Sequence, residues 1–129
     1  MIKIYTDGGS RGNPGKASCA YVVVKDGEII KESSKFLGDG LTNNEAEYNA
    51  IIEVLENILE KDLEIISDSE LVVKQVTGEY KINKPHLQLL NQKIQGLISG
   101  RNVKFSNSKR ENEFITRADK LVNKKLDKS

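Results

Sequence analysis

The spacing of the hydrophobic residues changes abruptly near residue 42, and this change most constrains what the chain can fold into. Before it, "IKIYTD" (residues 2–7) and "ASCAYVVVKDGEIIKESSKFL" (residues 17–37) are rich in β-branched and aromatic residues, with Asp26-Gly27 as a strong hairpin signal. After it, apolar residues recur at helical intervals, at Tyr48, Ile51, Ile52, Leu55, Ile58 and Leu59. The pattern predicts three consecutive strands followed by a helix.

Two capping boxes indicate where helices begin. Thr42 is followed three residues later by Glu45, which predicts a helix starting near Asn43. Ser67 with Glu70 has the same spacing, at the end of the strand-like "LEIIS" (residues 63–67), and predicts a helix through residue 76.

The rest of the chain continues to alternate helices and strands. A third helix is expected after Pro85, a strand at residues 102–105 and a last helix over residues 114–126. In the order β-β-β-α-β-α-α-β-α, the first strands pair antiparallel and the later ones add in parallel through crossovers. We therefore expect an α/β fold: one five-stranded mixed sheet with helices on both faces, in a single domain over residues 1–129.

Composition excludes several classes of protein. Cys19 is the only cysteine, so an internal disulfide is impossible and a cysteine-based zinc site is not expected. No stretch approaches eighteen apolar residues and the first residues lack a signal-peptide pattern, so we expect a cytoplasmic protein.

Residues 37–72 hold ten acids against one lysine, whereas residues 73–129 hold thirteen Lys/Arg against five acids. The basic half could meet a polyanion, or the two halves could be solvated faces of opposite sign.

Four glycines fall within residues 8–15, directly after Asp7, which raises the possibility of a nucleotide-binding loop. A P-loop ending at Gly15-Lys16 would need a glycine where Ser10 stands and a hydroxyl where Ala17 stands. The dinucleotide fingerprint and the twelve-residue calcium loop are also absent. The segment is therefore not a known phosphate cradle.

Four acids lie at strand ends or on helix faces that point into the protein. Asp7 ends the first strand, Asp68 follows a buried strand, and Glu47 and Asp119 fall on or beside the apolar stripes of their helices. Each has a structural explanation when taken alone; Asp68, for example, suits a helix N-terminus. Together they are harder to explain, because a carboxylate on a core-facing position needs a cation or strong hydrogen bonds.

If the four acids converge, their chemistry follows. Two like charges about 5 Å apart repel by roughly 3 kcal/mol at an effective dielectric near 20, and Mg²⁺ relieves such strain. A pair of Mg²⁺ ions about 3.5–4 Å apart suits the attack of water on a phosphodiester. The acids therefore suggest phosphodiester hydrolysis.

Four segments resemble the successive signature blocks of type 1 ribonuclease H: "YTDGGSRGNPG", "TNNEAEYNAI", "SDSELVVKQVTGEYKI" and "ADKLVN". They occur in the family's order and span nearly the whole chain. The resemblance implies the ribonuclease H fold and metal-dependent hydrolysis of the RNA strand of RNA/DNA hybrids, with two Mg²⁺ or Mn²⁺ ions. It also implies that the metal ligands are Asp7, Glu47, Asp68 and Asp119, with Glu47 orienting the attacking water.

The resemblance further implies a set of residues that line the hybrid: Ser10, Gly12, Asn13, Asn43, Asn44 and Gln75. Short polar side chains and backbone amides can hydrogen-bond ribose 2′-hydroxyls, which distinguish RNA from DNA. Alternatively, the two asparagines cap a helix and Gln75 is exposed.

The chain departs from the family in three places. The family often has a histidine in the loop before the last helix, but "SNSKRENEF" (residues 106–114) has none, and Lys109 or Arg110 could contact phosphate there instead. His86, the only histidine, stands at an expected helix start. An extra basic helix and tryptophan are also missing, which predicts salt-sensitive binding through Lys74, Lys81, Lys84, Lys104, Lys109 and Arg110.

Two other functions remain open at this point. One is a nucleic-acid-binding module of the same fold with little catalysis. The other is a nuclease of the same fold that prefers double-stranded RNA or RNA 3′ ends. For the hybrid-cleaving enzyme we expect a monomer.

Overall fold

The structure is a computed structural model that describes residues 1–129, and its centre is a five-stranded sheet in the order β3-β2-β1-β4-β5. The strands are β1 (Ile2–Arg11), β2 (Gly15–Lys25), β3 (Glu28–Leu41), β4 (Asp62–Ser67) and β5 (Asn102–Asn107). The helices are α1 (Asn43–Asn57), α2 (Glu70–Val76), α3 (Pro85–Ile98) and α4 (Glu113–Asp127).

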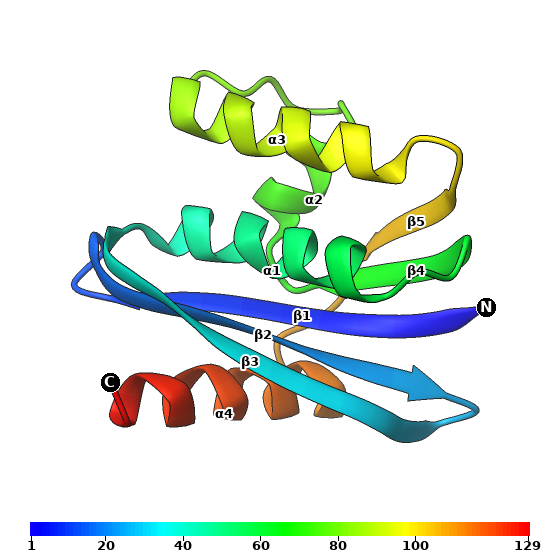
Figure 1. Cartoon of the computed structure of the whole chain (residues 1–129), viewed down its shortest axis with the longest axis horizontal. Helices are drawn as coiled ribbons and strands as arrows, with labels where there is room; N and C mark the ends of the chain where they lie inside the picture. The colour runs from blue at the N-terminus through cyan, green and yellow to red at the C-terminus, as the bar shows by residue number, and fades with distance from the viewer.

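The sheet is mixed and covered on both faces. β2 pairs antiparallel with β1 and β3, whereas β4 pairs parallel with β1 and β5. Helices α1, α2 and α3 lie on one face and α4 lies alone on the other (Figure 1). The predicted architecture is confirmed, including the tight β2–β3 hairpin, where Asp26 and Gly27 adopt positive φ values of 51° and 79°.

Each central strand contributes to two cores because successive side chains point to opposite faces. On β1, Ile4 packs in the large cluster under α1, while Tyr5 packs in the cluster under α4. β2 alternates in the same way, with Val23 in the first cluster and Val22 in the second. This double burial fixes α1 and α4 on opposite sides of β1.

No helix has the length and hydrophobicity needed to cross a membrane.

β1 is longer than the sequence predicts. The prediction ended the strand at Asp7 and treated the following glycines as a loop, but β1 continues to Arg11. The cause is pairing with β2, which continues from Gly8 opposite Cys19 to Arg11 opposite Lys16. Asp7 therefore lies within the strand, and the prediction that it ends the strand is wrong.

One capping box is confirmed and the other is wrong. Thr42 and Glu45 cap α1 reciprocally, as predicted. At α2 the N-cap is Ser69, whose Oγ accepts a hydrogen bond from the backbone N–H of Val72. Ser67 is still in β4, and its Oγ accepts from the Ser69 backbone N–H instead. The local hydroxyl closest to the free N–H groups of the helix takes the capping role.

Candidate active site

Strand register brings the first two acids together. β1 and β4 run parallel with Thr6 opposite Ser67, so the residues that follow, Asp7 and Asp68, lie side by side at the same edge of the sheet. Asp7 is only 8% exposed although its side chain is a carboxyl group. The parallel pairing therefore creates the centre of the site.

α1 supplies the third acid. Glu47 is 8% exposed, and its Oε1 accepts a hydrogen bond from the backbone N–H of Gly8. The Ser67 hydroxyl donates to Glu47 Oε2 at 3.5 Å. A Cβ atom on Gly8 would lie 2.3 Å from the backbone carbonyl carbon of Ala46, so only glycine allows α1 this close to β1. The glycine next to Asp7 thus positions Glu47.

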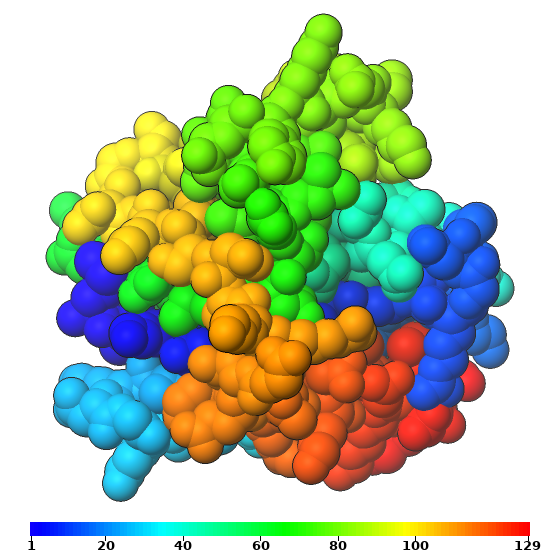
Figure 2. Space-filling view, turned by 180° about the vertical axis from the view of Figure 1, so that it is seen from behind, coloured from blue at the N-terminus to red at the C-terminus, as the bar shows by residue number.

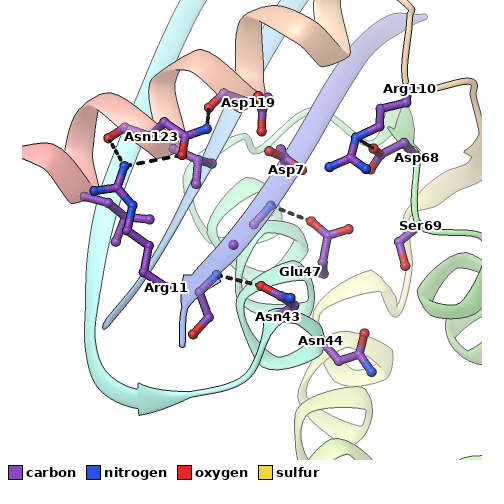
Figure 3. A pocket seen from close by; sticks show the side chains of 15 residues that line it. Asp7, Arg11, Asn43, Asn44, Glu47, Asp68, Ser69, Arg110, Asp119 and Asn123 are labelled. Atoms are coloured by element: carbon purple, nitrogen blue, oxygen red, sulfur yellow. Dashed lines mark hydrogen bonds and ion pairs between the residues drawn. The ribbon is translucent and has the colours of Figure 1, made fainter. Parts of the chain in front are cut away.

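α4 supplies the fourth acid from the opposite face of the sheet. Asp119 follows the buried Ala118 and lines the same hollow as the other three acids. This hollow has a volume of about 290 Å³ and is overwhelmingly polar in its lining. In Figure 2, the glycine-rich turn (blue) lies near the C-terminal part of α4 (red), with the start of α1 (teal) above them. Figure 3 shows the labelled acids around the hollow.

Burial and mutual repulsion make the carboxyl groups of Asp7 and Glu47 hard to ionise. Oxygen atoms of Asp7, Glu47 and Asp68 lie within 4.8 Å of one another. Burial, followed by the charges of Asp68 and Asp119, raises the pKa of Asp7 to about 8. Burial and the charges of Asp7 and Asp68 raise the pKa of Glu47 well above its usual range. The protein by itself does not balance this concentration of negative charge.

The loop before α4 places one cation beside the acids. The Arg110 Nε lies 4.0 Å from Asp68 Oδ2, and 85% of the arginine side chain is exposed. Burial raises the pKa of Asp68, and the Arg110 charge opposes that rise. Of the two basic residues in this histidine-free loop, Arg110 lines the hollow and Lys109 does not.

The residues present fit a divalent metal centre. The donor atoms are carboxylate oxygens, which Mg²⁺ and Mn²⁺ prefer over nitrogen or sulfur. Three of them converge within the spacing that a cation can bridge, and the hollow leaves room for water and a phosphate. The donor set fits a hard cation that neutralises part of the charge.

The residues predicted to line the substrate are partly assembled around the same hollow. Ser10, Asn43 and Asn44 line it together with the acids. The Ser10 backbone N–H donates to Asn43 Oδ1 at 2.7 Å, and the Asn43 backbone N–H donates to Asn13 Oδ1 at 2.9 Å. Gly12 lies in the turn that these contacts hold, with φ of 110°. The turn and the start of α1 therefore form one connected surface.

Gln75 does not line this hollow, nor do Gly12, Asn13 and His86. Gln75 is buried on α2, where its Oε1 accepts a hydrogen bond of 2.7 Å from the Tyr48 hydroxyl, so the alternative of an exposed Gln75 is wrong. His86 is the second residue of α3, which agrees with the expected helix start, and it lines a separate hollow of about 310 Å³ with Lys84 and Asn13.

Arg11 and Asn123 are polar residues of the hollow that were not predicted as site residues. Arg11 and Asn123 both line it, and the Arg11 Nη2 donates to the backbone oxygen of Asn123 at 3.3 Å. Asn123 follows Asp119 by four residues, a spacing that places both on one face of α4 and was a usable signal. Arg11 carried no such signal because its strand was expected to end four residues earlier.

The comparisons with known proteins agree with this geometry. The RNase H family model matches residues 1–127. The chain belongs to the RNase H family. It is similar to ribonuclease HI of Halobacterium salinarum, with 38% identity over 98% of this chain and 64% of that protein. It is also 35% identical to the bifunctional protein Rv2228c of Mycobacterium tuberculosis, over 98% of this chain and 35% of that protein.

Solved RNase H1 structures share the fold. A structure of LC11 RNase H1 in complex with an RNA/DNA hybrid has a TM-score of 0.91 and 40% identity, covering 99% of this chain and 98% of that one. RNase H1 from Halobacterium salinarum has a TM-score of 0.88 and 38% identity, covering 99% of this chain and 98% of the solved one. The predicted ribonuclease H fold is confirmed. The chain nevertheless spans only 64% and 35% of the lengths of the two curated relatives named above.

Proposed function

We propose that this RNase H chain is a metal-dependent endoribonuclease that hydrolyses the RNA strand of RNA/DNA hybrids. The observation that carries the proposal is the meeting of four acids, from β1, α1, α4 and the end of β4, in one polar hollow. Family membership and the hybrid bound to the similar LC11 RNase H1 support the substrate.

The four acids would hold two Mg²⁺ or Mn²⁺ ions: Asp7, Glu47, Asp68 and Asp119. Such ions supply a water of lowered pKa and stabilise charge on the leaving oxygen. Glu47 is held in place by the Gly8 backbone N–H and lies within reach of the Ser67 hydroxyl, so its carboxylate is fixed well enough to orient a water. Arg110 stands beside Asp68 with most of its side chain free to meet a phosphate oxygen.

Selection of RNA is proposed to come from the surface formed by the turn and the start of α1. Ser10, Asn43 and Asn44 lie in the hollow, and the turn beside them brings Gly12 and Asn13 close. Amide groups and hydroxyls there can donate to or accept from ribose 2′-hydroxyls. Gln75 is a proposed contact as well, although its Oε1 is engaged by Tyr48.

A cleavage assay with strand-labelled duplexes tests the proposal. The wild-type protein in millimolar Mg²⁺ should cut the RNA strand of a hybrid internally, and Asp68→Asn should cut it at least about a hundredfold more slowly, since each 1.4 kcal/mol of lost stabilisation is tenfold. A protein that cuts no hybrid in either form would be a binding module. Faster cutting of double-stranded RNA, or trimming from RNA 3′ ends, would assign a different substrate to the same site.

In addition to this function, we predict that the protein is cytoplasmic, that it is a monomer and that residues 1–129 form a single domain. The use of Mg²⁺ rather than Mn²⁺, and the number of ions bound, belong to the proposal.

A further inference from the structure

Arg11 lines the hollow of the four acids but has no part in the proposed metal site. It is the last residue of β1, and 47% of its side chain is exposed. Its Nη2 lies 2.6 Å from Asp127 Oδ1 on α4. The same atom donates to the backbone oxygen of Asn123 at 3.3 Å and to its Oδ1 at 3.4 Å. The guanidinium group is therefore oriented by α4 while one side of it stays open.

Arg11 and Arg110 are the only cationic residues that line the hollow. Figure 3 shows them on opposite sides of the acids, Arg110 beside Asp68 and Arg11 beside Asn123. A nucleic acid strand that places one phosphate at the acids must carry further phosphates away from them in both directions. Each direction then leads past one arginine.

The contacts of Arg11 in the free protein do not explain its position. Its ion pair with Asp127 is exposed on both sides, with 65% of the aspartate side chain accessible, and pairs of this kind contribute little stability. A planar guanidinium group can bind a phosphate through two parallel hydrogen bonds, which is stronger and more specific than one exposed carboxylate contact. A phosphate could thus join or replace Asp127 as the partner of Arg11.

We propose that Arg11 binds a backbone phosphate of the RNA strand that flanks the cleavage position, on the α4 side of the acids. Asn123 and Asp127 hold the guanidinium group ready for that phosphate. The inference rests on the proposed function, because it needs a strand lying across the four acids.

A salt titration of hybrid binding tests the inference, with Asp68→Asn as the parent protein in Mg²⁺ so that the substrate stays intact. Arg11→Gln and Asp127→Asn are added to this parent singly. Arg117→Gln is the matched control, because 46% of its side chain is exposed and it pairs with Glu32 on β3, outside the hollow. Thermal unfolding of each variant confirms that it is folded.

Arg11→Gln should weaken hybrid binding about fivefold at low salt and reduce the slope of log affinity against log salt by about 0.7–0.9, the value of one phosphate contact. Arg117→Gln should leave the slope unchanged. Asp127→Asn should keep the parent slope, because the arginine remains to meet the phosphate. Shortening the RNA from one end should abolish the effect of Arg11→Gln, whereas shortening it from the other end should not.

Each contrary result has a defined meaning. If Arg11→Gln behaves like Arg117→Gln, the inference is overturned and the proposed function stands. If Asp127→Asn weakens binding as much as Arg11→Gln does, Arg11 only anchors β1 to α4, and the direct phosphate contact is overturned. If the parent protein does not bind a hybrid and the wild-type protein does not cut one, the proposed function and the inference both fail.

Discussion

Gly8 occupies the point where α1 comes closest to β1. Its backbone N–H donates to Glu47, and an added Cβ atom would lie 2.3 to 2.6 Å from backbone atoms of Ala46 and Glu47. Backbone atoms cannot turn aside as a flexible side chain can, so the helix would have to shift. One absent side chain thus sets the distance between two of the four acids.

The expected consequence is a strong and local intolerance of alanine. Gly8→Ala should lower the free energy of unfolding by about 3 kcal/mol, as overpacking of a tight contact does, and should also slow hybrid cleavage. Gly9→Ala is the neighbouring control, because its Cβ would meet only Val122 Cγ1 at 3.4 Å. Denaturant unfolding of the two variants checks this, and equal stabilities would contradict it.

Asp7 and Glu47 are buried in the same cluster of carboxyl groups, and the pKa of each is raised. Carboxylate oxygens of Asp7, Glu47 and Asp68 lie within 4.8 Å of one another. Two negative charges at that distance repel by roughly 3 kcal/mol at an effective dielectric near 20. A divalent cation that binds only the folded protein would relieve this repulsion and stabilise the fold.

Thermal unfolding should therefore depend on Mg²⁺. Millimolar Mg²⁺ should raise the melting temperature of the nucleic-acid-free protein by roughly 5 °C, and Asp7→Asn should remove most of that gain. At neutral pH the same variant should be more stable than wild type in chelator, because it removes a carboxyl group whose pKa the fold raises to about 8. A wild-type melting temperature indifferent to Mg²⁺ would argue against a shared metal site.

At the scale of elements, α1 ends without a basic residue in its last turn. Arg101, just before β5, supplies the missing charge from far along the chain. Its Nη1 donates to the Leu55 backbone oxygen at 3.0 Å, and its Nη2 donates to the backbone oxygens of Ile58 and Glu60. These three contacts tie the end of α1 to the segment that leads into β4.

Replacing this arginine tests how much the tie contributes. Arg101→Lys should lower the free energy of unfolding by about 2 kcal/mol, because one ammonium group cannot serve three carbonyl oxygens in this fork geometry. Lys93→Gln, which removes an exposed pair with Glu56, should change it by less than about 0.5 kcal/mol. Urea unfolding of the two variants measures the difference. If Arg101→Lys has the same free energy of unfolding as the wild type, the capping role is refuted.

Local signals predicted the elements better than distant ones. Thr42 and Glu45 are three residues apart and marked the start of α1, and Asp26-Gly27 marked the hairpin. The extension of β1 to Arg11 depended on pairing with β2, which no local pattern contains. The contacts of Arg101 with the end of α1 could not be predicted for the same reason, since its partners lie more than forty residues away in the sequence.

The candidate site shows the same division. Expected strand ends and helix faces indicated the four acids from the sequence, and the structure brings them to one hollow. Arg11 could be found only with α4 placed against the end of β1, whereas the spacing of Asn123 from Asp119 already pointed to that residue. The hydrogen bond of Gln75 to Tyr48 likewise needed α1 and α2 in place.

At the scale of the whole molecule, the net charge is only +1, but the acidic and basic residues are unevenly distributed along the chain. The acids that converge in the hollow are the proposed metal ligands, while the proposed contacts with a polyanion come from exposed lysines and arginines. Hybrid affinity should therefore fall about tenfold or more between roughly 50 and 200 mM salt, as phosphate contacts release counterions. An affinity that barely changes over this range would contradict electrostatic gripping of the substrate.

The central claim is that four acids brought together by the fold bind divalent cations and so cut RNA. The most direct test follows an end-labelled RNA strand in a hybrid, incubated with the protein in millimolar Mg²⁺, in excess chelator, and in chelator followed by excess Mg²⁺. We expect internal cuts in the first sample, none in the second and restored cuts in the third. Equal cutting with and without chelator, or none in any sample, would contradict the account.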